Sequence, residues 1–162
     1  MANEEMCFAN RRGGLCPPEW SFWRGGCYIV TDKVFVFEEA KTHCQDLGGG
    51  VMVPQSSEET NFILDLVSLG NHQYLQYLDN TGAGWINCTL STEWQCFDGG
   101  KAVKVWNWDA TQPNNMMDGG ESCTILLKGL HLAFKEGPWH DAPCSWEIAA
   151  ICKKPATPTL HV

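Results

Sequence analysis

The spacing of apolar residues predicts two amphipathic helices in the first half of the chain. The first apolar stripe recurs at intervals of three and four residues and comprises Phe37, Ala40, Cys44 and Leu47. The glycine run 48–50 is expected to end this helix. A second helix is predicted to begin at Ser56, where Glu59 three residues later completes a capping box. Its apolar face comprises Phe62, Ile63, Leu66 and Val67.

Short strands are predicted before and after these helices. Residues 16–30 indicate a small hairpin with Gly25 and Gly26 at its turn. After about residue 75, stretches rich in Gly, Asn, Asp and Pro separate short apolar runs, which are Gly84–Ile86, Thr124–Leu127 and Ala149–Cys152. The segment from about 98 to 121 is expected to be an irregular loop. A loop of that length occurs mainly where it is functional or pinned to the domain.

Composition and charge narrow the class of protein. The 162 residues are 44% hydrophobic and 19% charged, which indicates one folded domain rather than disorder. The net charge of −8 argues against a nucleic-acid partner, because phosphates require Lys and Arg. No apolar run approaches the roughly 20 residues that span a bilayer. The segment 1–10 has no hydrophobic signal core, so we read it as a mature N-terminus or as part of a longer ectodomain.

Nine cysteines indicate folding in an oxidising compartment, and they favour a secreted or extracellular protein. A zinc protein is the alternative, but paired Cys-x-x-Cys knuckles are lacking, so structural disulfides are favoured over metal thiolates. Catalysis has little support, because the sequence contains neither a nucleophile elbow nor a His-Glu-x-x-His helix. We therefore expect a recognition module and not an enzyme.

After the two predicted helices, a series of motifs follows in a fixed order: Trp85-Ile86, Trp106-Asn107-Trp108, Gln112-Pro113-Asn114, Glu121-Ser122-Cys123, Trp139-His140-Asp141-Ala142-Pro143-Cys144 and Ile151-Cys152. This order resembles a C-type lectin-like domain over roughly residues 16–154. The resemblance implies an α+β fold with two helices, two small antiparallel sheets and a long irregular loop. It divides the chain into a lead-in (1–15), the domain (16–154) and a tail (155–162). Asn87 departs from the family pattern, which has Gly after Trp-Ile.

The resemblance also implies a disulfide framework. Cys44 would pair with Cys152 and Cys123 with Cys144, while a Cys16–Cys27 bridge would mark the long form with its N-terminal hairpin. Two further cysteines, Cys88 and Cys96, lie outside the usual set, and their separation suggests a local bridge. Cys7 is left over, and either an inter-chain disulfide or a free cysteine is expected there.

One calcium site is implied by the lectin resemblance. The matching ligand positions are Gln112, Asn114, Glu121, His140 and Asp141. Pro113 would be cis, and two vicinal sugar hydroxyls would complete the coordination. His140 is the weak member, because imidazole is a poor calcium ligand and prefers zinc or copper. Three alternatives stay open: a working but weak calcium site, a degenerate structural loop, and a site remodelled for a transition metal.

The Gln-type loop resembles the galactose-selective class, so terminal galactose or N-acetylgalactosamine is expected over mannose. Met116 and Met117 stand where that class carries a stacking aromatic. An auxiliary calcium site is expected to be absent, because Asn115 and Ser122 replace its acids. The predicted function is a secreted, calcium-dependent lectin that gains avidity by forming oligomers. Alternatives are calcium-independent protein recognition, as in receptors and toxins, and ice binding of the type II antifreeze kind.

Most tryptophans are expected in the core, with Trp108 and Trp139 as the candidates for ligand contact. The loop acids Asp98, Asp109 and Asp118 are expected to be solvated residues or turn formers.

Overall fold

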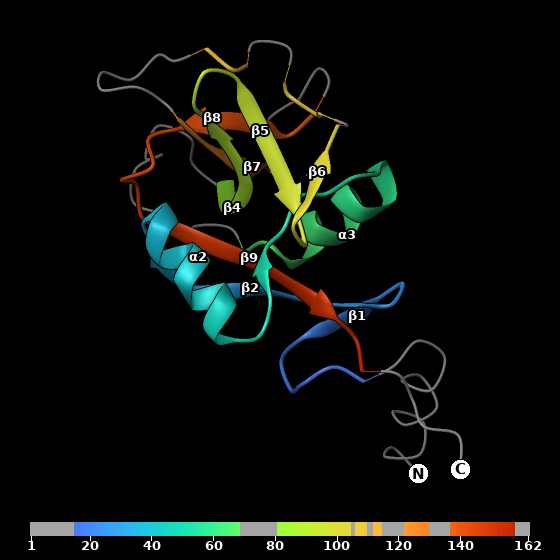
Figure 1. Cartoon of the computed structure of the whole chain (residues 1–162). Coiled ribbons are helices and arrows are strands. Elements are labelled where there is room, and N and C mark those ends of the chain that lie inside the picture. The colour runs from blue at the N-terminus through green and yellow to red at the C-terminus, as the bar shows by residue number, and fades with distance from the viewer. Residues whose placement is uncertain are drawn as a thin grey trace, which may run out of the picture.

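The computed structural model describes residues 15–68, 81–104, 106–109, 112–114, 122–129 and 137–157 (Figure 1). The helices are α2 (Phe37–Asp46) and α3 (Ser57–Leu66). The strands are β1 (Ser21–Trp23), β2 (Gly26–Phe35), β3 (Gly50–Val51), β4 (Thr81–Leu90), β5 (Trp94–Asp98), β6 (Lys101–Val103), β7 (Cys123–Gly129), β8 (Trp139–Ala142) and β9 (Ile148–Pro155). The α+β fold class predicted from the sequence is confirmed.

The strands join into one branched sheet rather than two separate ones. Its main path runs β1-β2-β9-β4-β5-β6, with β3 on β9 and the β7–β8 pair on β4. The junction is β4, which pairs with β7 along one edge. Its other edge pairs with β9 in parallel at Gly84 and Trp85, and with β5 from Cys88 onward. Sharing β4 in this way fuses the two expected sheets.

Both predicted helices are present. In α2 the buried residues are Phe37, Ala40 and Cys44, and the chain leaves the helix through Gly48 at φ +89°. In α3 the N-cap is Ser56, whose Oγ accepts the Glu59 N–H at 3.0 Å. Figure 1 shows α2 beside β9 and α3 near the β6 end of the molecule.

The predicted hairpin is confirmed, but its turn lies one residue earlier than expected. Arg24 and Gly25 occupy the turn with φ values of +43° and +82°. Two positive φ values match the twist of the flanking strands, which favours this type of two-residue turn. Pairing also continues past the predicted domain bounds, because Leu15 and Thr157 form an antiparallel bridge.

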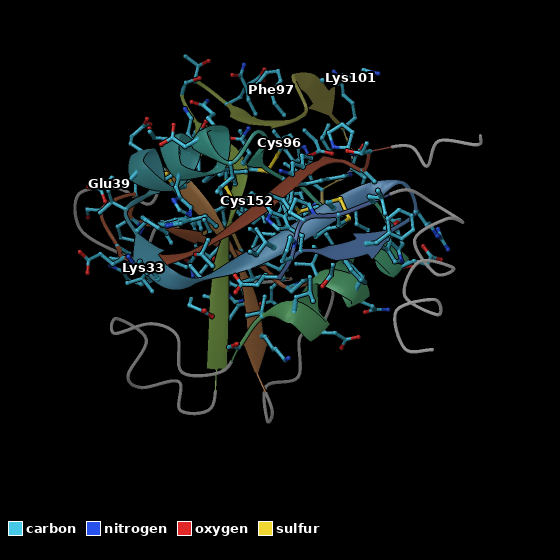
Figure 2. The ribbon with its side chains drawn as sticks, turned by 90° about the horizontal axis from the view of Figure 1, so that it is seen from below. Lys33, Glu39, Cys96, Phe97, Lys101 and Cys152 are labelled. Atoms are coloured by element: carbon cyan, nitrogen blue, oxygen red, sulfur yellow. A yellow bond between two sulfur atoms is a disulfide. The ribbon has the colours of Figure 1, made fainter. Side chains whose placement is uncertain are left out.

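Alternation along the central strands divides the core into two clusters. One contains Phe37, Trp85 and Cys152, and the other contains Ile63, Ile86 and Trp139. Neighbouring residues of one strand thus serve opposite faces of the sheet, as the period of two requires. Figure 2 shows Cys152 inside the molecule, with Lys33 and Glu39 at its surface.

All four predicted intrachain disulfides are present: Cys16–Cys27, Cys44–Cys152, Cys88–Cys96 and Cys123–Cys144. The local Cys88–Cys96 bridge joins directly paired residues of β4 and β5. Beside it, the Asn87 side-chain amide donates to the Phe97 carbonyl at 2.9 Å, which gives this departure from the family pattern a structural role. Cys7 lies outside the described residues.

Two expectations for the segment beginning at residue 98 are corrected. It is not wholly irregular, because β6 pairs with β5 through Lys101 to Val103. Asp98 is not a solvated loop residue, since its carboxylate lies 3.4 Å from Lys153 Nζ and accepts the Gln55 Nε2–H at 3.0 Å. It belongs to a polar network centred on buried Glu59, whose Oε2 accepts from Tyr28 Oη at 2.5 Å and from Lys153 Nζ at 3.0 Å.

Candidate functional site

Strand β8 carries His140 and Asp141 of the predicted site. Main-chain bonds from β8 also hold the segment that leads to Gln112. The segment 106–109 runs beside β8 through a parallel bridge between Trp108 and Trp139. The Asp109 N–H donates to the Trp139 carbonyl at 3.1 Å, and the Trp139 N–H donates to the Asn107 carbonyl at 3.2 Å. Gly137 permits this approach, because a Cβ there would collide with Asn107. The loop before the Gln-Pro-Asn motif is therefore fixed to the sheet by main-chain bonds.

Three residues later the same segment reaches the predicted ligand positions. The Gln112 N–H donates to the Asp109 carbonyl at 2.8 Å, which closes a turn, and the Gln112–Pro113 peptide is cis, as the resemblance implied. Gln112 Oε1 accepts the Asp141 N–H at 3.2 Å. In return, Asp141 Oδ1 accepts the Asn114 N–H at 3.2 Å. Reciprocal bonds thus bring Gln112, Asn114 and Asp141 together from segments almost thirty residues apart.

Two adjacent residues of β8 belong to the predicted site: Asp141, which is buried, and His140, which is partly buried. Asp141 is 5% exposed, and its main chain pairs with Thr124 of β7, so the sheet fixes its backbone. Burial lowers the pKa of the His140 imidazole below its ordinary value, although the negative charges of Asp109 and Asp141 oppose this shift. A lowered pKa keeps His140 neutral at pH 7, so it adds no positive charge that would repel a cation.

Glu121, Met116 and Met117 lie outside the described residues, as do Asn115 and Asp118. Among the residues that the structure describes, no group of three His, Cys, Asp or Glu side chains could hold a metal. Apart from the imidazole of His140, the described donor set consists of the amide oxygens of Gln112 and Asn114 and the carboxylate of Asp141, which fit a hard cation such as Ca²⁺ better than a thiolate-preferring metal.

Asp109 is a site neighbour that the sequence interpretation missed. It was expected to be a solvated residue or a turn former, and it does form the turn that leads into Gln112. Its negative charge also acts on His140, where it partly opposes the lowering of the imidazole pKa by burial. The available signal was its position three residues before Gln112, the spacing of a hydrogen-bonded turn.

The aromatic residues near the site are mostly core. Trp139 is fully buried, whereas Trp108 is half-buried and packs edge-on against both Trp94 and Trp139 at 4.9 and 5.7 Å between ring centroids. Trp106 is the exposed one, at 48%. Trp108 and Trp139 therefore pack against each other where the segment that leads to Gln112 runs beside β8.

Comparison with known proteins assigns the family. A family model of the Lectin C-type domain matches residues 35–154, which is most of the chain. The chain belongs to the C-type lectin family. This family is generally non-enzymatic, in agreement with the motif analysis.

Curated relatives of this C-type lectin domain are longer proteins. It is 30% identical over 142 residues to C-type lectin domain family 4 member M of Nomascus concolor, and 30% identical over 143 residues to CD209 antigen of Pongo pygmaeus. These matches cover 86% and 87% of this chain but only 31% of each relative. The chain therefore spans less than a third of the length of the curated relatives it matches.

Solved structures agree with the fold. The mouse scavenger receptor C-type lectin carbohydrate-recognition domain is 29% identical, with a TM-score of 0.67 and coverage of 88% of this chain and 99% of that one. A calcium-independent type II antifreeze protein is 25% identical, with the same TM-score and coverage of 88% and 96%. Within the described ranges of this domain, neither helix is long and apolar enough to cross a membrane.

Proposed function

We propose that this C-type lectin domain binds glycans through one calcium ion held by Gln112, Asn114, Glu121 and Asp141. The supporting observation is the pair of reciprocal hydrogen bonds that join Gln112 and Asn114 to Asp141. The domain would act outside cells, where its four disulfides are stable. Similarity to a carbohydrate-recognition domain along 88% of the chain supports a glycan as ligand.

The chemistry depends on oxygen donors whose positions are set by the fold. When bound, calcium would supply coordination positions for two vicinal sugar hydroxyls. Gln112 and Asn114 would contribute amide oxygens, and Asp141 and Glu121 would contribute the negative charge on which calcium affinity depends. The side-chain N–H groups of the two amides would donate to the bound hydroxyls, while the carboxylates would accept from them. Neutral His140 would lie at the edge of this set, as a hydrogen-bonding group for the sugar.

The Gln-Pro-Asn order favours terminal galactose or N-acetylgalactosamine as the sugar. Met116 and Met117 would cover its apolar face in place of an aromatic ring, because thioether side chains make favourable but less ordered contacts. Single sites of this type are weak, so useful binding would require several copies of the domain on one glycan surface.

A calcium-independent use of the fold is the second candidate. Its support is the similarity to the calcium-independent type II antifreeze protein, together with His140 at the position where sugar-binding relatives have an amide. Ice binding would appear as thermal hysteresis of a protein solution that contains a calcium chelator. A protein ligand would be bound equally well in calcium and in chelator.

Removing the charge of Asp141 is expected to weaken calcium binding. Asp141→Asn keeps an oxygen that can accept the Asn114 N–H, so the loop stays in place. Because calcium affinity follows ligand charge, we expect affinity to fall about tenfold or more, with a matching loss of galactose binding. Isothermal titration calorimetry measures the first and a glycan array the second. Exposed Asp65→Asn on α3 is the matched control and should leave both unchanged. Equal calcium affinity in Asp141→Asn and the parent protein would contradict this ligand assignment.

Replacing His140 is expected to strengthen the same site. His140→Asn exchanges an imidazole nitrogen for an amide oxygen, which is the better calcium donor. We expect calcium affinity to rise about threefold or more, measured by the same titration. If affinity falls instead, His140 belongs to a site of another kind, and zinc should then be tested in place of calcium.

A further inference from the structure

A second feature of the surface lies apart from the Gln112–Asp141 region. A cavity of about 740 Å³ opens among the glycines of three separate turns: 25–26, 48–50 and 99–100. The first turn joins β1 to β2, the second follows α2, and the third joins β5 to β6. We call it the basic cavity. Its size is that of a site for a small ligand or a short oligomer.

The charge of its lining is opposite to that of the whole chain. The chain carries 11 Lys and Arg against 19 Asp and Glu, yet the described lining includes four basic residues and one acidic residue. The basic residues are Arg24, Lys41, Lys153 and Lys154, and the acidic one is Asp98. Positive charge concentrated in one hollow of an acidic protein attracts anions there.

The four cations differ in how far they are already neutralised. Lys153 is held between Glu59 and Asp98 at 3.0 and 3.4 Å, so its charge is balanced within the fold. Lys154 Nζ donates to the uncharged Leu47 carbonyl at 2.9 Å. Lys41 lies 3.8 Å from Glu38, whose side chain is 79% exposed, and a pair of that kind is weak in water.

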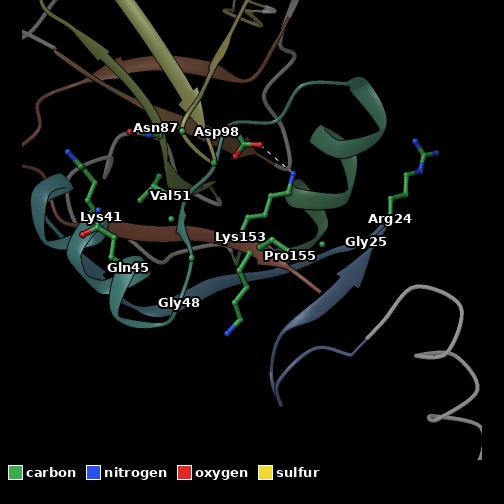
Figure 3. A pocket seen from close by; sticks show the side chains of 16 residues that line it. Arg24, Gly25, Lys41, Gln45, Gly48, Val51, Asn87, Asp98, Lys153 and Pro155 are labelled. Atoms are coloured by element: carbon green, nitrogen blue, oxygen red, sulfur yellow. Dashed lines mark hydrogen bonds and ion pairs between the residues drawn. The ribbon is translucent and has the colours of Figure 1, made fainter. Parts of the chain in front are cut away.

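The arrangement of these side chains suits an elongated ligand. Figure 3 shows Lys41 and Gln45 on α2 at one end of the cavity and Arg24 at the other, with Lys153 between them reaching toward Asp98. Arg24 packs over the Trp23 ring at 4.6 Å, which leaves its planar guanidinium able to donate. The glycine turns between these ends add no bulky side chains, so a chain of sugar units could lie against main-chain atoms.

We propose that the basic cavity binds a sulfated oligosaccharide, independently of calcium and of the Gln112–Asp141 site. Sulfate groups would pair with Lys41, Lys154 and Arg24, while Gln45 and glycine carbonyls would bind sugar hydroxyls. The described lining contains no aromatic ring on which a nucleobase could stack, and single-stranded nucleic acids depend on such stacking. Sulfated sugar therefore fits this lining better than nucleic acid does.

The test is titration with a heparin tetrasaccharide in EDTA, which silences any calcium site. The parent protein should bind it, and binding should weaken as salt rises, because the contacts are partly exposed charge pairs. Lys41→Gln combined with Lys154→Gln should lower the affinity about tenfold, because two positive charges that attract sulfate are lost. Gln45→Glu on the exposed face of α2 should lower the affinity about threefold, and it changes no side-chain hydrogen bond among those described.

The control removes the same charge elsewhere. Lys33→Gln combined with Lys104→Gln changes two exposed lysines outside the basic cavity and should leave affinity within about twofold. Equal weakening by both lysine pairs would overturn the proposal. So would tight binding of the desulfated tetrasaccharide, equally tight binding of an oligothymidine of the same charge, or no binding by the parent protein. Asp141→Asn should bind the tetrasaccharide normally, so failure of the calcium site and failure of the basic cavity are distinguishable.

Discussion

Replacing both Cys44 and Cys152 with alanine is expected to lower the free energy of unfolding by about 4–5 kcal/mol. This bridge closes a loop with a sequence separation of 108, so its loss releases the most chain entropy in the unfolded state. Both residues are fully buried and tie α2 to β9, so their removal also loosens the packing of that helix. A loss of that size is close to the whole stability of many domains.

The matched control is the Cys16–Cys27 bridge. Its sequence separation is 11, and the same chain-entropy relation gives a loss of about 3 kcal/mol when both cysteines become alanine. Urea unfolding of the two double variants compares them directly. Equal losses would contradict the loop-length explanation, and a larger loss from the short bridge would show that the hairpin carries more of the stability than the helix attachment does.

Glu59→Ala is expected to lower the free energy of unfolding by about 3 kcal/mol, although Glu59 is not one of the proposed calcium ligands. Its carboxylate accepts hydrogen bonds from Tyr28 Oη, from Lys153 Nζ and from the Gln55 N–H. Tyr28 is 1% exposed, so its hydroxyl would be left buried without this acceptor. Burial and the bond to Glu59 raise the pKa of Tyr28, which keeps the hydroxyl a donor at neutral pH. Lys153 would keep its ion pair with Asp98, which limits the loss of stability.

Glu58→Ala is the matched control, because Glu58 occupies the same first turn of α3 but is exposed. It should change stability by no more than about 0.5 kcal/mol. Thermal and urea unfolding of the two variants give the difference. A loss in Glu58→Ala as large as that in Glu59→Ala would assign the effect to the helix terminus and not to the buried network.

The sequence predicted those parts of the fold that depend on local periodicity or on the family motif order. The stripe through Phe37, Ala40 and Cys44 predicted the buried face of α2, and the family resemblance implied the pairing of Cys44 with Cys152. Strand β6 was missed because three residues with a single buried side chain, Val103, give no alternation to detect. The hairpin turn was predicted one residue too late, because Arg24 adopts a positive φ, which residues other than glycine usually avoid.

The site was predicted as a set of positions, but its internal contacts were not predictable. Gln112 and Asp141 belong to distant segments, and the bonds between them depend on how the loop lies along β8. The buried network likewise joins Tyr28, Glu59, Asp98 and Lys153 from four separate elements. No local pattern signals such a network, because an acidic residue in the first turn of a helix is ordinarily solvated.

A calcium titration followed by nuclear magnetic resonance tests the central claim most directly. The resonances to follow are the side-chain amide of Gln112 and the main-chain amides of Asn114 and Asp141, the groups through which the two segments meet. We expect all three to shift with calcium, and to shift again on addition of galactose only when calcium is present. Unchanged resonances at saturating calcium, or a galactose response that persists in EDTA, would contradict a calcium-dependent glycan site at this position.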